Sequence, residues 1–148
     1  MLWKRLRADT RWAGALMATA DRDVRRVTAV AAVAVRDTSL PRGEAARAGR
    51  AALAELPGFT TGDALASAVL TAAAPHRMAV YDRRAHTALR ALGIALTDRP
   101  GRCSRYITTI DHLLAHAPTP ARTWTPRDMD TALYSLPPQP AEPNGTHV

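Results

Sequence analysis

One aspartate in the middle of the chain stands where a helix is expected to begin. Asp82 follows the short apolar stretch 78–81 and directly precedes Arg83 and Arg84. A side-chain oxygen at such a position accepts a hydrogen bond from the unpaired N–H groups of the first helical turn. The same carboxylate, if it faces a groove, can stabilise developing positive charge or activate water. Two interpretations of Asp82 therefore stay open, a helix cap and a catalytic acid, and one residue can serve as both.

A glycine-containing turn between two expected helices lies upstream of Asp82. The turn begins with Leu56-Pro57-Gly58 and ends at Gly62. Proline cannot continue a helix, and glycine adopts the left-handed conformation that ends one. Turn amides and the N-terminus of the next helix point N–H groups outward, where they can bind an anion. We expect Gly58, Thr60 and Gly62 to contact a DNA phosphate, which positions DNA without reading its sequence.

From Leu53 to Leu92 the chain resembles the helix-hairpin-helix DNA glycosylases. In that family a Leu-Pro-Gly hairpin leads into an alanine-rich helix, and a short loop then holds a hydrophobic residue, a variable residue and a catalytic aspartate. Val80 and Asp82 match the hydrophobic residue and the aspartate. The resemblance implies that Asp82 stabilises the oxocarbenium-like sugar and activates water, and that double-stranded DNA is the partner.

Other residues are assigned around this aspartate by their chemistry. Arg83 and Arg84 can meet phosphates that flank an extruded nucleotide, although both also suit a solvated helix face. A flipped base needs an aromatic or apolar wall. By residue type alone, the candidates for that wall are Phe59, Tyr81 and Trp124.

The lysine that bifunctional glycosylases carry in their hairpin has no counterpart here. Gly62 and Asp63 occupy that neighbourhood. The resemblance therefore implies a monofunctional enzyme, which releases a base and leaves the abasic site uncut.

Metal and thiol chemistry receive little support from the sequence. His112 and His116 lie four residues apart on one expected helix, but a catalytic zinc takes about three protein ligands. We expect these histidines to be surface residues, and we expect neither a metal nor another cofactor. Cys103 is the only cysteine, which excludes an internal disulfide and fits a cytoplasmic protein.

Composition and pattern predict an all-α fold. Hydrophobic residues make up 47% of the 148-residue chain, yet aromatic residues only 5%, because alanine, the best helix former, dominates. We expect one domain over residues 1–136, a compact orthogonal bundle of about seven helices with the hairpin at about 44–74. Residues 137–148 are proline-rich, which is typical of a disordered tail.

Local signals indicate where these helices begin and end. The expected helices are 10–20, 22–36, 44–56, 63–74, 83–92, 104–117 and 126–136. Asp21 is expected to cap the second of them, and Thr125 with Asp128 is expected to form a near capping box at the start of the last.

The net charge of +7, carried almost entirely by arginine, favours an anionic partner. The apolar run 27–35 is too short to cross a membrane. The leading hypothesis is a DNA-binding protein that resembles a base-excision glycosylase. Two alternatives stay open. One is a non-catalytic helix-hairpin-helix DNA-binding protein, and the other is a helical module that binds a protein partner, its arginine surplus being only compositional.

Overall fold

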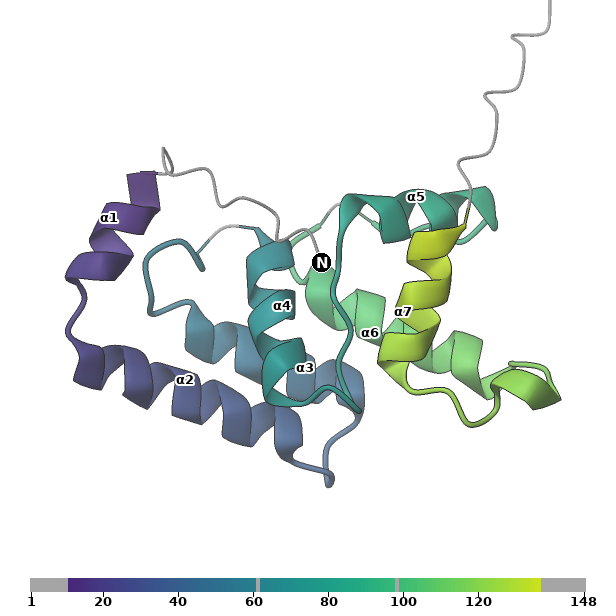
Figure 1. Cartoon of the computed structure of the whole chain (residues 1–148), viewed down its shortest axis with the longest axis horizontal. Helices are drawn as coiled ribbons and strands as arrows, with labels where there is room; N and C mark the ends of the chain where they lie inside the picture. The colour runs from purple at the N-terminus through teal and green to yellow at the C-terminus, as the bar shows by residue number, and fades with distance from the viewer. Residues whose placement is uncertain (1–10, 61, 98, 137–148) are drawn as a thin grey trace, which may run out of the picture.

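Every regular element within the described part of the chain is helical, which confirms the predicted all-α fold. The computed structural model describes residues 11–60, 62–97 and 99–136, so the predicted tail at 137–148 lies outside the described residues. The elements in chain order (Figure 1) are α1 (Arg11–Ala18), α2 (Asp21–Arg36), α3 (Arg42–Leu53), α4 (Asp63–Ala73), α5 (Arg83–Ala91), α6 (Arg102–Ala115), the 3₁₀ turn η1 (Thr119–Ala121) and α7 (Pro126–Ser135).

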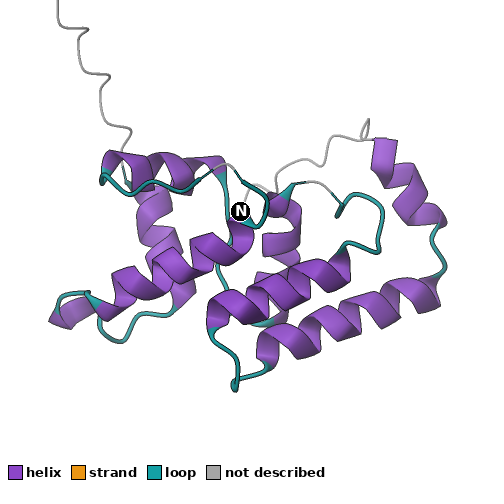
Figure 2. Cartoon of the chain, turned by 180° about the vertical axis from the view of Figure 1, so that it is seen from behind, coloured by secondary structure: helices purple, strands orange, loops and turns teal. Residues whose placement is uncertain are grey.

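The helices form two groups that meet where α3 packs against α6. In the first group α2 lies alongside α3, and α4 crosses both; in the second, α7 packs against α5 and α6 (Figures 1 and 2). Both groups contribute to one core, whose largest fully buried side chains include Leu53, Leu70, Met78, Leu89, Tyr106, Ile107 and Ile110. Among the described residues, none of the helices combines the length and the apolar character needed to cross a membrane.

Small residues let α3 lie at the centre of this arrangement. A Cβ atom built on Gly49 would lie 2.8 Å from Cδ2 of Leu70 on α4 and 2.8 Å from Cγ1 of Val35 on α2. Contacts that short do not occur between real side chains, so the three helices can approach this closely only because the residue is glycine.

Two of the three helix caps predicted from the sequence are present in the structure. Thr125 and Asp128 form the predicted capping box at the start of α7, and Asp82 caps α5 as expected. The predicted cap at Asp21 is wrong, because α2 begins at Asp21 itself and its cap position is Ala20, which has no side-chain oxygen.

The third helix is displaced toward the N-terminus relative to the predicted range 44–56. It spans Arg42–Leu53, because the N–H groups of residues 54, 55 and 56 each bond to the carbonyl three residues earlier. That bonding pattern tightens the chain out of the α-helix before Pro57 is reached.

Candidate active site

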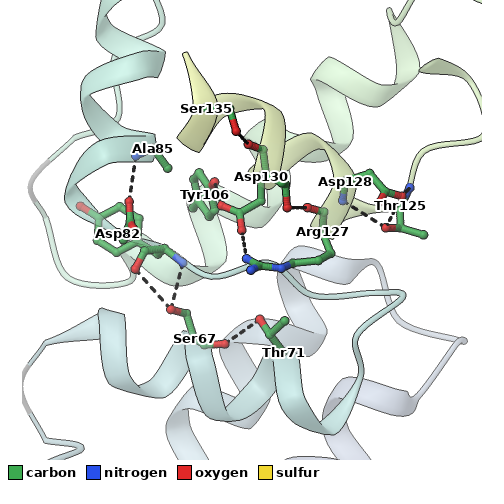
Figure 3. Close-up of polar contacts among 12 residues, drawn as sticks. Ser67, Thr71, Asp82, Ala85, Tyr106, Thr125, Arg127, Asp128, Asp130 and Ser135 are labelled. Atoms are coloured by element: carbon green, nitrogen blue, oxygen red, sulfur yellow. Dashed lines mark hydrogen bonds and ion pairs between the residues drawn. The ribbon is translucent and has the colours of Figure 1, made fainter. Parts of the chain in front are cut away.

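A buried serine fixes the connector that carries Asp82. Residues 74–82 run from α4 to α5, and the side chains of Met78, Ala79 and Tyr81 are buried. The Tyr81 backbone N–H donates to Oγ of Ser67 at 3.0 Å (Figure 3). That hydroxyl itself donates to the carbonyl of Ala64 at 2.8 Å. Because these contacts hold the residue before it, Asp82 leaves the core in a fixed direction.

The Asp82 side chain has two surroundings. Its Oδ1 atom accepts the backbone N–H of Ala85 at 2.9 Å, which is the helix cap expected from the sequence. The side chain, which is partly exposed, also lines a cavity of about 210 Å³ between the connector and α7. Among the described residues, the Ala85 N–H is the one hydrogen-bond donor to this carboxylate. We refer to this space as the Asp82 cavity; it is lined by Val80, Asp82, Arg127, Asp130, Thr131 and Tyr134.

A second carboxylate, Asp130 of α7, forms the inner wall of the Asp82 cavity. Its residue is only 3% exposed. Oη of Tyr106 donates to it at 2.6 Å, and the guanidinium of Arg127 pairs with its other oxygen (Figure 3). A hydrogen bond from the backbone of Val80 also acts on it. Burial raises the pKa of Asp130, against the opposing effect of these donors. Burial, and then the charge of Asp130, raise the pKa of Tyr106 as well.

Sequence reasoning missed Asp130, Tyr106 and Arg127 as members of this site. One signal was available, since Asp130 falls three residues before Leu133 and four after Pro126, on the face of α7 that is buried. A carboxylate on the apolar face of a helix is uncommon and calls for a partner.

The two arginines after Asp82 lie on the outer surface of α5. Both are exposed, and the guanidinium of Arg84 stacks over the ring of Tyr134, 4.2 Å from its centroid. Arg84 therefore lies at the rim of the Asp82 cavity, next to its one aromatic lining residue. Arg83 is exposed in the first turn of the same helix.

The three residues expected to form a base pocket do not line the Asp82 cavity. Phe59 is 5% exposed and belongs to the hydrophobic core. Tyr81 is buried and packs edge-on against Tyr106, with ring centroids 5.6 Å apart. Trp124 is exposed and lines a separate, open hollow on another face of α7. The aromatic wall of the Asp82 cavity is Tyr134, on a helix remote from the hairpin in sequence.

The expected phosphate-binding turn connects α3 and α4, and its residues have different surroundings. Gly58 (φ +87°) lies under the indole of Trp12, because a Cβ there would be 2.5 Å from the ring. Thr60 and Gly62 line a cavity of about 300 Å³, together with Arg50, Asp63, Arg99, Pro100, Gly101 and Arg102.

A carboxylate of the protein itself, that of Asp63, lies next to this turn. Asp63 is the first residue of α4, and its Oδ1 accepts Nε of Arg50 at 2.9 Å. Its Oδ2 accepts the backbone N–H of Cys103 at 3.4 Å, at the start of α6. An acid of the protein itself thus lies beside the predicted phosphate-binding turn, and its negative charge is paired with Arg50.

The histidines and the cysteine do not form a reactive site. His112 and His116 line an apolar hollow on α6, and within the described ranges no three His, Cys, Asp or Glu side chains gather as they would around a metal ion. Cys103 is buried, and burial raises the pKa of its thiol to about 12.

Comparisons with protein-family models, with curated proteins and with solved structures find no match for this chain.

Proposed function

We propose that the protein is a monofunctional DNA glycosylase in which Asp82 is the catalytic carboxylate. The observation that carries the proposal is the position of Asp82, which caps α5 with one oxygen and also lines a cavity. A carboxylate with a free face beside a cavity can approach a substrate, whereas one surrounded by donors cannot.

The chemistry asked of Asp82 is stabilisation of a positively charged sugar. When the bond between C1′ and the base nitrogen breaks, its electron pair leaves with the base, and positive charge develops on the deoxyribose. A carboxylate beside the ring stabilises that charge. A water molecule then forms the new bond to C1′ and gives its proton to Asp82, and the released base takes up a proton from solvent. The cleavage leaves the phosphodiester backbone intact.

The size of the Asp82 cavity suits one extruded base. About 210 Å³ is below the roughly 300–1,000 Å³ of pockets that enclose drug-sized ligands. One ring system fits a space of that size, with Tyr134 as the aromatic surface for stacking. The guanidinium of Arg84 stacks over this ring and helps to fix its orientation.

Base release from defined oligonucleotides tests the proposal. The full-length protein is incubated with single- and double-stranded DNA that carries oxidised, alkylated or deaminated bases, and abasic sites are counted. Asp82→Asn removes the charge but keeps the helix cap, because asparagine caps helices as well as aspartate. We expect this variant to lose at least about 100-fold in rate, the lower limit for removing a group that transfers a proton.

A matched control changes an acid remote from the cavity. Asp21→Asn alters an exposed acid in the first turn of α2 and should leave base release unchanged. The proposal is wrong if wild-type protein releases no base from any substrate, or if Asp82→Asn retains the wild-type rate.

A non-catalytic DNA-binding protein is the second candidate function. The lining of the cavity at Thr60 and Gly62 favours it, because three arginines there outnumber one acid, Asp63, and positive charge attracts phosphates at any sequence. If this second function is correct, the protein should bind duplex DNA in a salt-sensitive way and release no base. Asp82→Asn should then bind DNA at least as tightly as wild type.

A further inference from the structure

Among the described residues, Asp130 is the one charged residue that is fully buried. The other buried side chains in that part of the chain that carry polar groups have hydroxyls or a thiol, and they are Ser67, Thr71, Tyr81, Tyr106 and Cys103. A buried carboxylate loses its hydration and needs several donors in compensation. The donors to Asp130 come from three segments: Tyr106 of α6, Val80 of the connector and Arg127 of α7 itself.

These donors divide into two kinds. Tyr106 and Val80 tie α7 to α6 and to the connector that carries Asp82, so they hold separate segments together. Arg127 lies three residues before Asp130 on the same helix and joins no other element. Because both partners belong to α7, this ion pair ties no two segments together, although it does compensate the buried carboxylate. It also fixes a guanidinium at one place on the protein surface.

That place is the wall of the Asp82 cavity. The Arg127 side chain is 49% exposed, while the Asp130 side chain is 4% exposed. Among the described residues, Asp130 is the one hydrogen-bond partner of the Arg127 guanidinium, through Nη1. A guanidinium has five N–H donors in a planar fork, so several of them remain available to a ligand.

We propose that Arg127, held by the buried carboxylate of Asp130, binds a backbone phosphate of the nucleic acid whose sugar lies beside Asp82. The ligand is a phosphodiester, and Asp130 is a positioning residue that acts through Arg127. This inference rests on the proposed function, since it names the contact that places the substrate. A planar fork matches two phosphate oxygens at once, and fixing the fork in advance lowers the entropy lost on binding.

The charges around the cavity are compatible with this assignment, because two guanidinium groups balance two carboxylates. Asp82 and Asp130 give the cavity two carboxylates, which repel a phosphate. Arg127 on its wall and Arg84 at its rim supply the compensating positive charge. A polyanionic strand can therefore approach the cavity along its arginine side while the sugar faces Asp82.

The test measures binding of the full chain to undamaged duplex DNA by fluorescence anisotropy over a range of salt concentrations. Arg127→Gln keeps a donor for Asp130 but removes the charge. We expect about tenfold weaker binding, and the slope of log affinity against log salt should fall by about 0.9 for one lost phosphate contact. Arg127→Lys keeps the charge but not the fork and should recover the slope but only part of the affinity.

Arg47→Gln is the matched control, since it removes the same charge from an exposed position on α3. It should leave the slope unchanged. Circular dichroism at each condition confirms that the variants are folded. If Arg127→Gln and Arg47→Gln give the same slope and affinity, or if wild type does not bind duplex DNA, the phosphate contact is refuted.

A double-mutant cycle tests the positioning role of Asp130. Asp130→Asn should weaken binding severalfold in the wild-type background and have no further effect once Arg127 is replaced by glutamine. An equal loss in both backgrounds would show that Asp130 acts only through the fold, and would overturn this role.

Base release separates this inference from the proposed function. Asp82→Asn should lower the turnover rate without weakening binding, because it removes a charge that repels phosphate, whereas Arg127→Gln should mainly raise KM. If no base is released but Arg127→Gln still lowers the salt slope, the glycosylase proposal fails and the phosphate contact stands. If Asp82→Asn abolishes release and Arg127→Gln changes neither KM nor slope, the reverse holds.

Discussion

Two regions of the molecule each have an aspartate at the start of a helix, and they use it differently. Asp63 begins α4 next to the hairpin turn, and its side chain is 10% exposed. Both of its oxygens accept hydrogen bonds, from Arg50 and from the backbone of Cys103. Asp82 caps α5 through one backbone N–H and otherwise faces a cavity.

The difference shows which acid is available for chemistry. A carboxylate that is paired with a guanidinium and enclosed contributes to the fold, because removing its partner leaves an uncompensated buried charge. A carboxylate held by one amide costs little to change and can meet a substrate. The sequence predicts phosphate binding at the turn between α3 and α4. The acid at that turn, Asp63, is thus the one whose hydrogen bonds are already made within the protein.

The largest effect expected from this comparison is on stability, at the hairpin. Arg50→Ala should lower the free energy of unfolding by about 3 kcal/mol, because it leaves Asp63 buried without its partner. Urea denaturation monitored by circular dichroism measures the loss. Arg25→Ala breaks an exposed pair with Asp21 and should barely move the midpoint. Equal losses in the two variants would contradict a structural role for Asp63.

The turn itself can be tested at its glycines. Gly58→Ala should cost about 2 kcal/mol, since the residue has φ +87° and the new Cβ would overlap the Trp12 ring. Gly62→Ala shares the positive φ but meets nothing within 4 Å, so it should cost less. Comparing the two denaturation midpoints isolates the overlap with Trp12. If both substitutions cost the same, Trp12 does not cover the turn in solution.

A smaller stability effect is expected at the other aspartate. Asp82→Ala removes the cap of α5 and should cost about 1 kcal/mol, while Asp82→Asn should cost almost nothing. Both should lose base release to a similar extent. Thermal denaturation and abasic-site counting on the same samples make the comparison. If Asp82→Ala lowers the free energy of unfolding as much as Arg50→Ala does, Asp82 is a structural acid like Asp63.

Whether a structural feature of this protein could be predicted from the sequence depends on how far apart along the chain the interacting residues lie. The capping box of Thr125 and Asp128 and the cap at Asp82 were predictable, because each is made within four residues. The end of α3 was not, since nothing local separates a final α-turn from the tighter turn seen there.

The same distinction between local and long-range interactions applies to the residues of the candidate site. Asp82 was found because helix caps are local, and its place on a cavity wall is contributed by α7. Asp130 falls on the apolar face of its helix, which calls for a partner, but the sequence does not show that the partner is Tyr106, 24 residues earlier. Trp12 over Gly58 is likewise a contact between distant segments. Such contacts depend on how helices pack, and residue spacing along the chain does not show them.

The smallest expected effect concerns pH and the acid behind the Asp82 cavity. Burial raises the pKa of Asp130 above its ordinary value of 3.8, so the folded protein holds that proton more tightly than the unfolded chain does. The resulting stabilisation is complete below pH 3.8 and is lost as the pH rises through the raised folded-state pKa. The amide introduced by Asp130→Asn has no such proton to lose.

We therefore expect the free energy of unfolding of wild type, minus that of Asp130→Asn, to fall with rising pH in the acidic range and then become constant. Urea titrations at a series of pH values measure it. Asp37 and Asp128, whose pKa values are lowered by hydrogen bonds from Ser39 and Thr125, are present in both chains and cancel in the difference. A difference that rises with pH would mean that Asp130 is stabilised as an anion by its donors more than burial disfavours it, and its carboxylate would then resemble the paired acid of the hairpin.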